Sequence, residues 1–175
     1  MFGSNRRGRG SAPTLRWLAA VAEGWARQTP AWSRLVRSDT DGRWVAPLAI
    51  NNRSEVWLQG WPVGEHIELH DHGGAAGALC VVGGRLEETF APNQSATRLA
   101  RRTLERRSVI AFDADHIHDV VNVGGTPALT IQVYTPRLVS MTHYRSRRGR
   151  GLEAIGVELS DHPEIVLTPK GWVAV

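Results

Sequence analysis

The sequence predicts an all-β domain, an antiparallel barrel or sandwich that follows a short helical region. From residue 43 onward, short segments rich in β-branched and aromatic residues alternate with turns of glycine, proline and asparagine. Upstream, residues 14–37 place apolar side chains at helical spacing. With 175 residues, 42% of them hydrophobic, the chain is long enough for one domain with a hydrophobic core and short for two.

The N-terminal part is expected to hold a tail and then helices. Residues 1–13 are rich in arginine and glycine, which predicts a flexible basic tail. Thr14 then opens a helical pattern whose apolar stripe consists of Trp17, Leu18, Val21, Ala22 and Trp25. Pro30 ends this helix or follows its end, and a second short helix is expected over residues 32–36.

The strands of the barrel are expected over about residues 43–136. Residues 137–175 are less regular, and we expect this C-terminal extension to contain one more strand pair, near "LEAIGVEL" and "EIVLTPKGWVAV". Residues 14–175 are therefore predicted to form a single domain.

Basic residues outnumber acidic ones, and arginine supplies nearly all of the excess. The formal net charge is +4 at pH 7, and Lys170 is the lone lysine. The string RRGRG occurs twice, at residues 6–10 and 147–151. Such segments can neutralise phosphates, but no aromatic residue interleaves with them to stack on bases. We therefore predict a solvated tail and loop, and keep a nucleic-acid adaptor as the weakest alternative.

The sequence has no feature typical of a membrane protein or of an oxidising compartment. No apolar run approaches the roughly 20 residues needed to cross a bilayer, and residues 1–13 lack the apolar segment of a signal peptide. Cys80 is the only cysteine, so no intramolecular disulfide can form. We expect a cytoplasmic protein without a membrane partner, as a monomer or a homodimer.

The histidine pattern is the strongest chemical signal in the sequence. Four of the seven histidines fall into two pairs with one residue between the members: His70 with His72, and His116 with His118. On a strand, residues two apart point the same way, so each pair is expected to project from one face. His66 and Glu68 share the parity of the first pair, which predicts a polar inward face. A metal ion would satisfy such side chains, which are costly to bury unpaired.

A single His-x-His pair also occurs on strands as an exposed or hydrogen-bonded pair, without any metal. The second pair favours the metal, because it lies about 45 residues downstream and can return on another strand of the same barrel. Asp71 has the opposite parity to His70 and His72, and we expect it to hold a loop or an arginine.

The spacing of glycines and histidines resembles the two motifs of the cupin superfamily. The first motif is matched by Gly64, His70, His72 and Gly84. Gly77 stands where the usual motif has glutamate, and His118 with Asn122 matches the second motif. The resemblance covers roughly residues 56–136 and implies a cupin barrel.

Within that superfamily the chain resembles cysteine dioxygenase and its thiol dioxygenase relatives. Those proteins have a helical N-terminal region, the string HDH, glycine or cysteine in place of the motif glutamate, and a strand that ends in Tyr-Ser/Thr-Pro. The string HDH, Gly77 and the string YTP match this pattern here. The resemblance implies three metal ligands, His70, His72 and His118, and an active-site tyrosine, Tyr134. It also implies that Thr130 and Gln132 orient this tyrosine, while His116 is expected either beside the ligands or at the surface.

Two positions depart from that family's pattern. Gln132 stands where the relatives have histidine, and glutamine cannot titrate near neutral pH. Ala46 stands where cysteine dioxygenases carry the arginine that clamps the substrate carboxylate, and a methyl group cannot replace a guanidinium. Three replacements stay open: Arg43, Arg53 or an arginine within residues 145–150.

Some relatives link the active-site tyrosine to a cysteine. Gly77 occupies the matching position, so this chain cannot form the link, and Cys80 lies at the opposite parity. The positions expected to line the substrate pocket are Gly77, Trp61, His66, His143 and Arg53.

The resemblance implies a non-haem Fe(II) thiol dioxygenase, with one iron per chain and O2 as co-substrate, which converts a small thiol to a sulfinic acid. The missing arginine leaves the thiol open among cysteine, cysteamine, 3-mercaptopropionate and ergothioneine. Two alternatives remain: a non-catalytic cupin that senses a metal or ligand, and a cupin enzyme of other chemistry.

Overall fold

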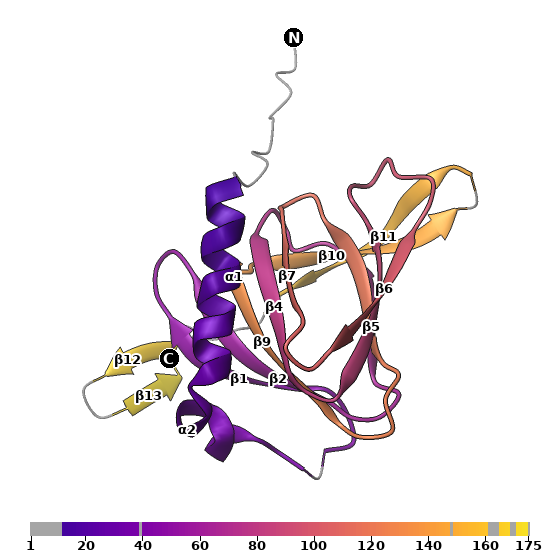
Figure 1. The fold of residues 1–175 in the computed structure, drawn as a ribbon. Helices are drawn as coiled ribbons and strands as arrows, with labels where there is room; N and C mark the ends of the chain where they lie inside the picture. Colours follow the sequence, from indigo (N-terminus) through magenta and orange to yellow (C-terminus); the bar gives the residue numbers. More distant parts are fainter. Residues whose placement is uncertain (1–11, 39, 148, 161–164, 169–170, 175) are drawn as a thin grey trace.

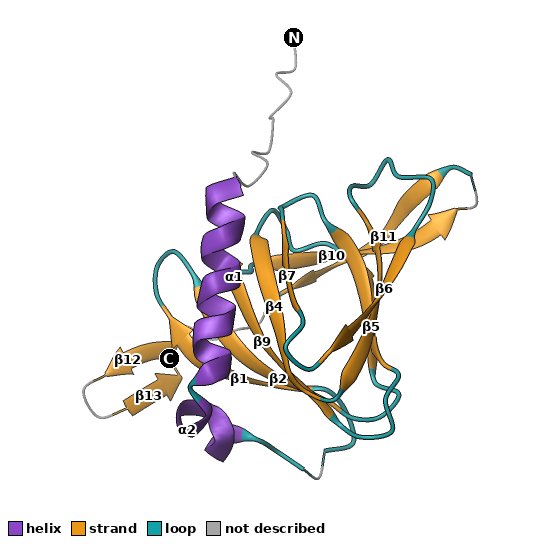
Figure 2. Ribbon diagram, viewed as in Figure 1, coloured by secondary structure: helices purple, strands orange, loops and turns teal. Residues whose placement is uncertain are grey.

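The structure, a computed structural model, is a barrel of two antiparallel sheets with one long helix against its outside (Figures 1 and 2). The predicted all-β fold with a short helical region before it is confirmed. The residues described are 12–38, 40–147, 149–160, 165–168 and 171–174. Most of the expected basic tail lies outside these residues, and the first helix begins at Ala12 rather than at Thr14.

Three helical elements precede the barrel: α1 (Ala12–Arg27), α2 (Thr29–Trp32) and a 3-10 turn (Ser33–Leu35). α1 packs on the five-stranded sheet through Leu18 and Ala22, both fully buried. Trp17, expected in the same apolar stripe, is 49% exposed, because neighbouring residues point about 100° apart around a helix. Within the described residues, no helix has the length and apolar character needed to span a bilayer.

The five-stranded sheet has the order β1-β2-β9-β4-β7. Its strands are β1 (Trp44–Ile50), β2 (Glu55–Trp61), β4 (Ala76–Gly83), β7 (Val109–Phe112) and β9 (Ala128–Thr135). Alternation along β2 separates two cores, since Val56 and Leu58 pack towards α1 while Trp57 and Trp61 pack inside the barrel. Cys80 belongs to the core on the α1 side, away from Tyr134.

The six-stranded sheet has the order β11-β10-β3-β8-β5-β6 and closes the other side of the barrel. Its strands are β3 (His66–His70), β5 (Arg85–Ala91), β6 (Ala100–Glu105), β8 (Ile117–Asn122), β10 (Ser140–Arg147) and β11 (Gly151–Leu159). All of its neighbouring strands pair antiparallel.

A β-bulge in β3 changes which of its side chains face inward. The cross-strand pairs on either side of it are Ile67 with Val120 and His70 with His118. Three steps along β3 thus match two along β8, and the extra residue reverses the alternation. Ile67 and His70 line the interior cavity, whereas His66 and Glu68 are exposed. The predicted inward face is therefore wrong for His66 and Glu68.

The C-terminal extension does not pair as predicted. β11 pairs with β10, its close neighbour in sequence, in an arm that extends beyond the barrel at the upper right of Figure 1. β12 (Ile165–Thr168) and β13 (Gly171–Ala174) instead pair with each other as a separate sheet. Arg147 and Arg150 of the second RRGRG string lie near the turn of the arm and are exposed. The first string lies outside the described residues.

Candidate metal centre and adjoining cavity

Three imidazoles, two from neighbouring strands and one from the turn after β3, converge inside the barrel. His70 ends β3, His72 lies two residues further along the chain, and His118 lies on β8 directly opposite His70. One nitrogen from each ring lies within 4.8 Å of the others, and all three side chains are buried. The structure thus brings together the three residues that the sequence analysis expected as metal ligands.

The turn that carries His72 depends on glycine and on the half-buried carboxylate of Asp71. Gly73 and Gly74 have φ angles of 59° and 96°, in the left-handed region that favours glycine. The carboxylate of Asp71 accepts hydrogen bonds from the Gly73 N–H, the Thr142 N–H and the Tyr144 hydroxyl. Asp71 therefore holds a loop, one of its two expected roles, and ties the turn to β10.

Hydrogen bonds decide which nitrogen two of the rings present. His70 Nδ1 donates to the Glu68 carbonyl at 2.8 Å, and His118 Nδ1 donates to Glu88 Oε1 at 2.7 Å. Each bond leaves the Nε2 lone pair of its ring free for a metal. Burial, and then the neighbouring His118, holds the pKa of His70 well below its usual value, so this ring is neutral at pH 7.

His72 gives the clearest indication that a metal fits here. Both of its ring nitrogens are buried, and neither has a hydrogen-bond partner among the described residues. Burial, followed by the rings of His118 and His70, lowers its pKa well below the usual value. A neutral imidazole without partners is costly to bury. A cation bound by the three rings would satisfy one of its nitrogens, so the residues present fit a metal.

A buried carboxylate that the sequence analysis missed joins this centre to the second histidine pair. Glu88 on β5 is fully buried, and its Oε1 accepts hydrogen bonds from His118 and, at 3.0 Å, from His116 Nε2. Its Oε2 accepts one from Arg102. Burial acts to raise the pKa of Glu88, but the bonds from His116 and His118 outweigh it and hold that pKa far below its usual value. His116, expected either beside the metal ligands or at the surface, is buried beside the ligands.

Tyr134 lies beside the three histidines at the end of a hydrogen-bonded chain. Its hydroxyl donates to Gln132 Oε1, and Gln132 Nε2 donates to Thr130 Oγ1 at 3.3 Å. Trp61 Nε1 donates to the same oxygen at 3.0 Å. The ring centroids of Tyr134 and His72 are 5.4 Å apart. Burial raises the pKa of Tyr134 well above its usual value, so the hydroxyl keeps its proton.

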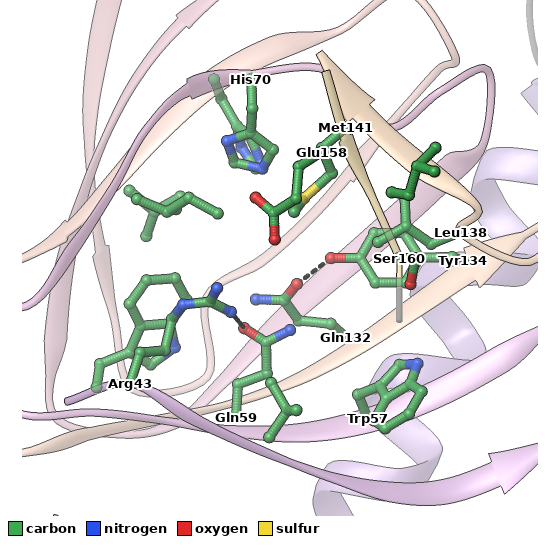
Figure 3. A pocket seen from close by; sticks show the side chains of 16 residues that line it. Arg43, Trp57, Gln59, His70, Gln132, Tyr134, Leu138, Met141, Glu158 and Ser160 are labelled. Carbon is green, nitrogen blue, oxygen red and sulfur yellow. Dashed lines mark hydrogen bonds between the residues drawn. The ribbon is translucent and has the colours of Figure 1, made fainter. Parts of the chain in front are cut away.

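A cavity of about 280 Å³ lies between the two sheets, with His70 and His118 in its wall (Figure 3). Its lining mixes indole and aliphatic surface with two amides, a guanidinium and a carboxylate. The residues other than the histidines are Arg43, Val45, Trp57, Gln59, Trp61, Ile67, Val120, Gln132, Tyr134, Leu138, Met141, Glu158, Leu159 and Ser160. The cavity suits a small polar molecule of about the size of an amino acid.

Several predicted pocket positions do not line this cavity, although Trp61 does. The bulge in β3 turns His66 outward. Arg53 is exposed in the turn between β1 and β2. His143 is not a lining residue, but it contacts one, since its Nε2 donates to Glu158 Oε2 at 3.0 Å. The predictions for His66, Arg53 and His143 as lining residues are therefore wrong.

Arg43 is the arginine that the structure brings to the cavity. Its Nη1 donates to Gln59 Oε1 at 3.5 Å, and its guanidinium carbon lies 5.6 Å from the centroid of the Trp61 ring. Along β1, Val45 lines the cavity while Ala46 is buried in the core beneath α1. An arginine at position 46 would point away from the cavity. The sequence analysis expected the carboxylate-binding arginine at position 46, but that position is on the face of β1 that points away from the cavity.

The family of this chain follows from a match that spans the whole centre. The sequence model described as cysteine dioxygenase type I matches residues 13–147, which hold all three histidines and Tyr134. This chain belongs to the cysteine dioxygenase type I family. No curated protein matches it. Members of the family normally bind a metal, and the buried histidines can hold one.

Solved structures with the same fold are distant in sequence. The protein TT1209 from Thermus thermophilus gives a TM-score of 0.52 at 21% identity, over 60% of this chain and 93% of that one. A cupin superfamily protein from Desulfitobacterium hafniense gives 0.51 at 17%, over 61% and 89%. An oxalate oxidase gives 0.51 at 14%, over 61% and 59%. At these identities the likeness shows the cupin fold alone.

In this member of the cysteine dioxygenase family, Gly77 leaves room for an aromatic ring rather than for substrate. A Cβ at Gly77 would lie 2.5 Å from the Phe112 ring. That ring stacks on His72, with 4.7 Å between centroids and an interplanar angle of 23°. Gly77 is not among the lining residues, so its assignment to the pocket is wrong, and Phe112 is a neighbour of the centre that sequence reasoning missed.

We predict that Gly77→Ala destabilises the protein by about 1–3 kcal/mol, because the methyl group must displace a packed ring. Urea unfolding measures the change in the free energy of unfolding. The matched control is Gly83→Ala on the same strand, where the nearest atom to a new Cβ is Leu129 Cβ at 4.0 Å. An equal loss in both variants would contradict the packing argument.

Proposed function

We propose that this chain is a non-haem Fe(II) thiol dioxygenase, which adds both atoms of O2 to the sulfur of a small thiol and yields a sulfinic acid. The observation that carries the proposal is a group of three buried imidazoles with no carboxylate in it, beside Tyr134 and a cavity. Three neutral ligands leave the full charge of a divalent cation available to attract a thiolate. Membership of the cysteine dioxygenase type I family supports the same reaction.

Iron held by His70, His72 and His118 would supply the redox chemistry that joins a thiolate to dioxygen. The contribution of the protein is to keep these rings neutral and in place. Burial keeps His70 neutral, and the Glu68 carbonyl holds its orientation. Burial likewise lowers the pKa of His118, while Glu88, itself held by Arg102, fixes the orientation of that ring.

Tyr134 is proposed to hold a proton beside the reacting sulfur. In the described arrangement its hydroxyl proton is donated to Gln132. If the Gln132 amide flips by 180°, it can still bind both Thr130 and Tyr134, because the Thr130 hydroxyl can donate a hydrogen bond as well as accept one. The turned amide would donate to the Tyr134 oxygen and leave the tyrosine proton for the cavity. A flip of the Gln132 amide can thus reverse the direction of these hydrogen bonds without any change in its protonation state.

Arg43 is proposed to bind an anionic group of the substrate. A guanidinium pairs with a carboxylate through two parallel hydrogen bonds, and Arg43 is the arginine in the cavity lining. Gln59 and Trp61, which contact it, limit how far the side chain can move. This role would restore the carboxylate clamp from a residue three positions before Ala46.

Two other functions remain to be separated from this one by experiment. An oxalate oxidase shares the fold, which leaves open another metal-dependent oxidation, and a non-catalytic cupin would bind a metal without turnover. Metal analysis of protein purified without added metal, followed by oxygen uptake with cysteine, cysteamine, 3-mercaptopropionate and ergothioneine, separates the three. Product mass must increase by two oxygen atoms if the proposal holds. Cytoplasmic location and a monomeric or homodimeric state remain predictions.

We predict that His118→Ala loses bound metal and thiol-dependent oxygen uptake together, because two imidazoles alone hold a divalent ion poorly. Metal content per chain and an oxygen electrode provide the two measurements. His66→Ala is the control, since this exposed histidine lies on the strand of His70 and should change neither. Full uptake in His118→Ala would disprove the ligand assignment.

We predict that Glu88→Gln weakens metal binding by about 10–100-fold, because an amide cannot accept all three of the hydrogen bonds that the carboxylate accepts. Competition with a chelator of known affinity measures the change. Glu87→Gln is the control on the same strand, where Glu87 pairs with the exposed Arg101, and it should bind metal like the unaltered protein. Unchanged affinity in Glu88→Gln would show that Glu88 only supports the fold.

A further inference from the structure

One wall of the cavity comes from a strand outside the family match. The cysteine dioxygenase type I match ends at residue 147, and β11 starts at Gly151. Glu158 and Leu159 on β11, and Ser160 just after it, nevertheless line the cavity. The family match therefore does not extend to this wall of the cavity.

Glu158 directs its carboxylate into the cavity. In Figure 3 it lies between His70 and the side chains of Gln132 and Tyr134. Glu158 pairs across the hairpin with Met141, another lining residue, so both side chains lie on the face of the hairpin that points into the cavity. Its side chain is 57% exposed, which leaves the carboxylate reachable by an incoming ligand.

His143 holds this carboxylate by one oxygen. His143 Nε2 donates to Glu158 Oε2 at 3.0 Å, and the His143 ring centroid is 6.2 Å from that of His70. His143 is also the β10 residue that pairs with His70 on β3. The contact links the arm to the metal-binding strand, and no hydrogen bond engages Oε1 within the described residues.

Arg43 and Glu158 give the cavity one positive and one negative charge, from opposite sheets. Arg43 precedes β1 and is held by Gln59, while Glu158 comes from the last strand of the six-stranded sheet. A thiol that carries only a carboxylate would meet repulsion from Glu158. A thiol that carries a protonated amine would find a partner there.

Building on the proposed thiol dioxygenase function, we propose that Glu158 determines specificity by receiving the protonated amine of the thiol substrate. The substrate class is then amino thiols, either with a carboxylate that Arg43 can bind or without one. His143 is a positioning residue that acts through Glu158. The carboxylate is partly solvated, so its effect on substrate choice should be moderate and sensitive to salt.

The test compares cysteamine, which carries an amine, with 3-mercaptopropionate, which carries a carboxylate. Glu158→Gln should lower the ratio of kcat/KM for cysteamine to kcat/KM for 3-mercaptopropionate by about 3–10-fold. The difference should shrink as ionic strength rises. Glu153→Gln is the control, because Glu153 on the same strand pairs with Arg147 away from the cavity, and it should leave the ratio unchanged.

An equal loss for both thiols, or no change in the ratio, would overturn the role of Glu158. If the unaltered protein oxidises neither these thiols nor cysteine, the proposed function fails instead. Calorimetric binding of the same two thiols to protein loaded with zinc, which has no redox chemistry, then still decides the inference. The role of Glu158 stands if Glu158→Gln weakens cysteamine binding more than 3-mercaptopropionate binding, and falls if it does not.

Discussion

The pairing of β3 with β8 sets the geometry on which the rest of the centre depends. His70 faces His118 across these strands, and the turn after β3 brings His72 back towards both. The bulge before His70 makes this possible, because without the extra residue His70 would take the outward parity of His66. One register shift thus separates a metal-binding face from an exposed one.

Burying this many polar groups requires that each has a partner. Glu88 provides one for His116, His118 and Arg102, and Thr130 provides one for Trp61 and Gln132. These two networks lie in opposite sheets and meet at the histidines and Tyr134. The two ring nitrogens of His72 have no hydrogen-bond partner among the described residues. A cation bound by the three histidines would be a partner for one of them.

The arm of β10 and β11 contributes Met141, Glu158 and Leu159 to the wall of the cavity. It is fastened beside the centre by Asp71, which binds Thr142 and Tyr144, and by the pairing of His143 with His70. Family membership accounts for the chain as far as residue 147. The three histidines and Tyr134 lie within the matched residues, whereas Glu158, Leu159 and Ser160 of the cavity wall lie beyond them.

The sequence by itself determined the all-β barrel, the helical region before it, the three histidines and the alternation that places Thr130, Gln132 and Tyr134 together. These features are local: they depend on strand periodicity and on the spacing of motifs.

Only the tertiary structure decided that His66 faces outward, that Arg43 rather than a residue at position 46 reaches the cavity, and that Phe112 fills the space beside Gly77. It also decided the places of Glu88 and Glu158. The inward parity of Glu88 with the buried Leu86 was a signal that it needs a partner, but not which one. A bulge, a cross-strand register and a contact between strands far apart in sequence have no local signature, because they are set by how the two sheets close on each other.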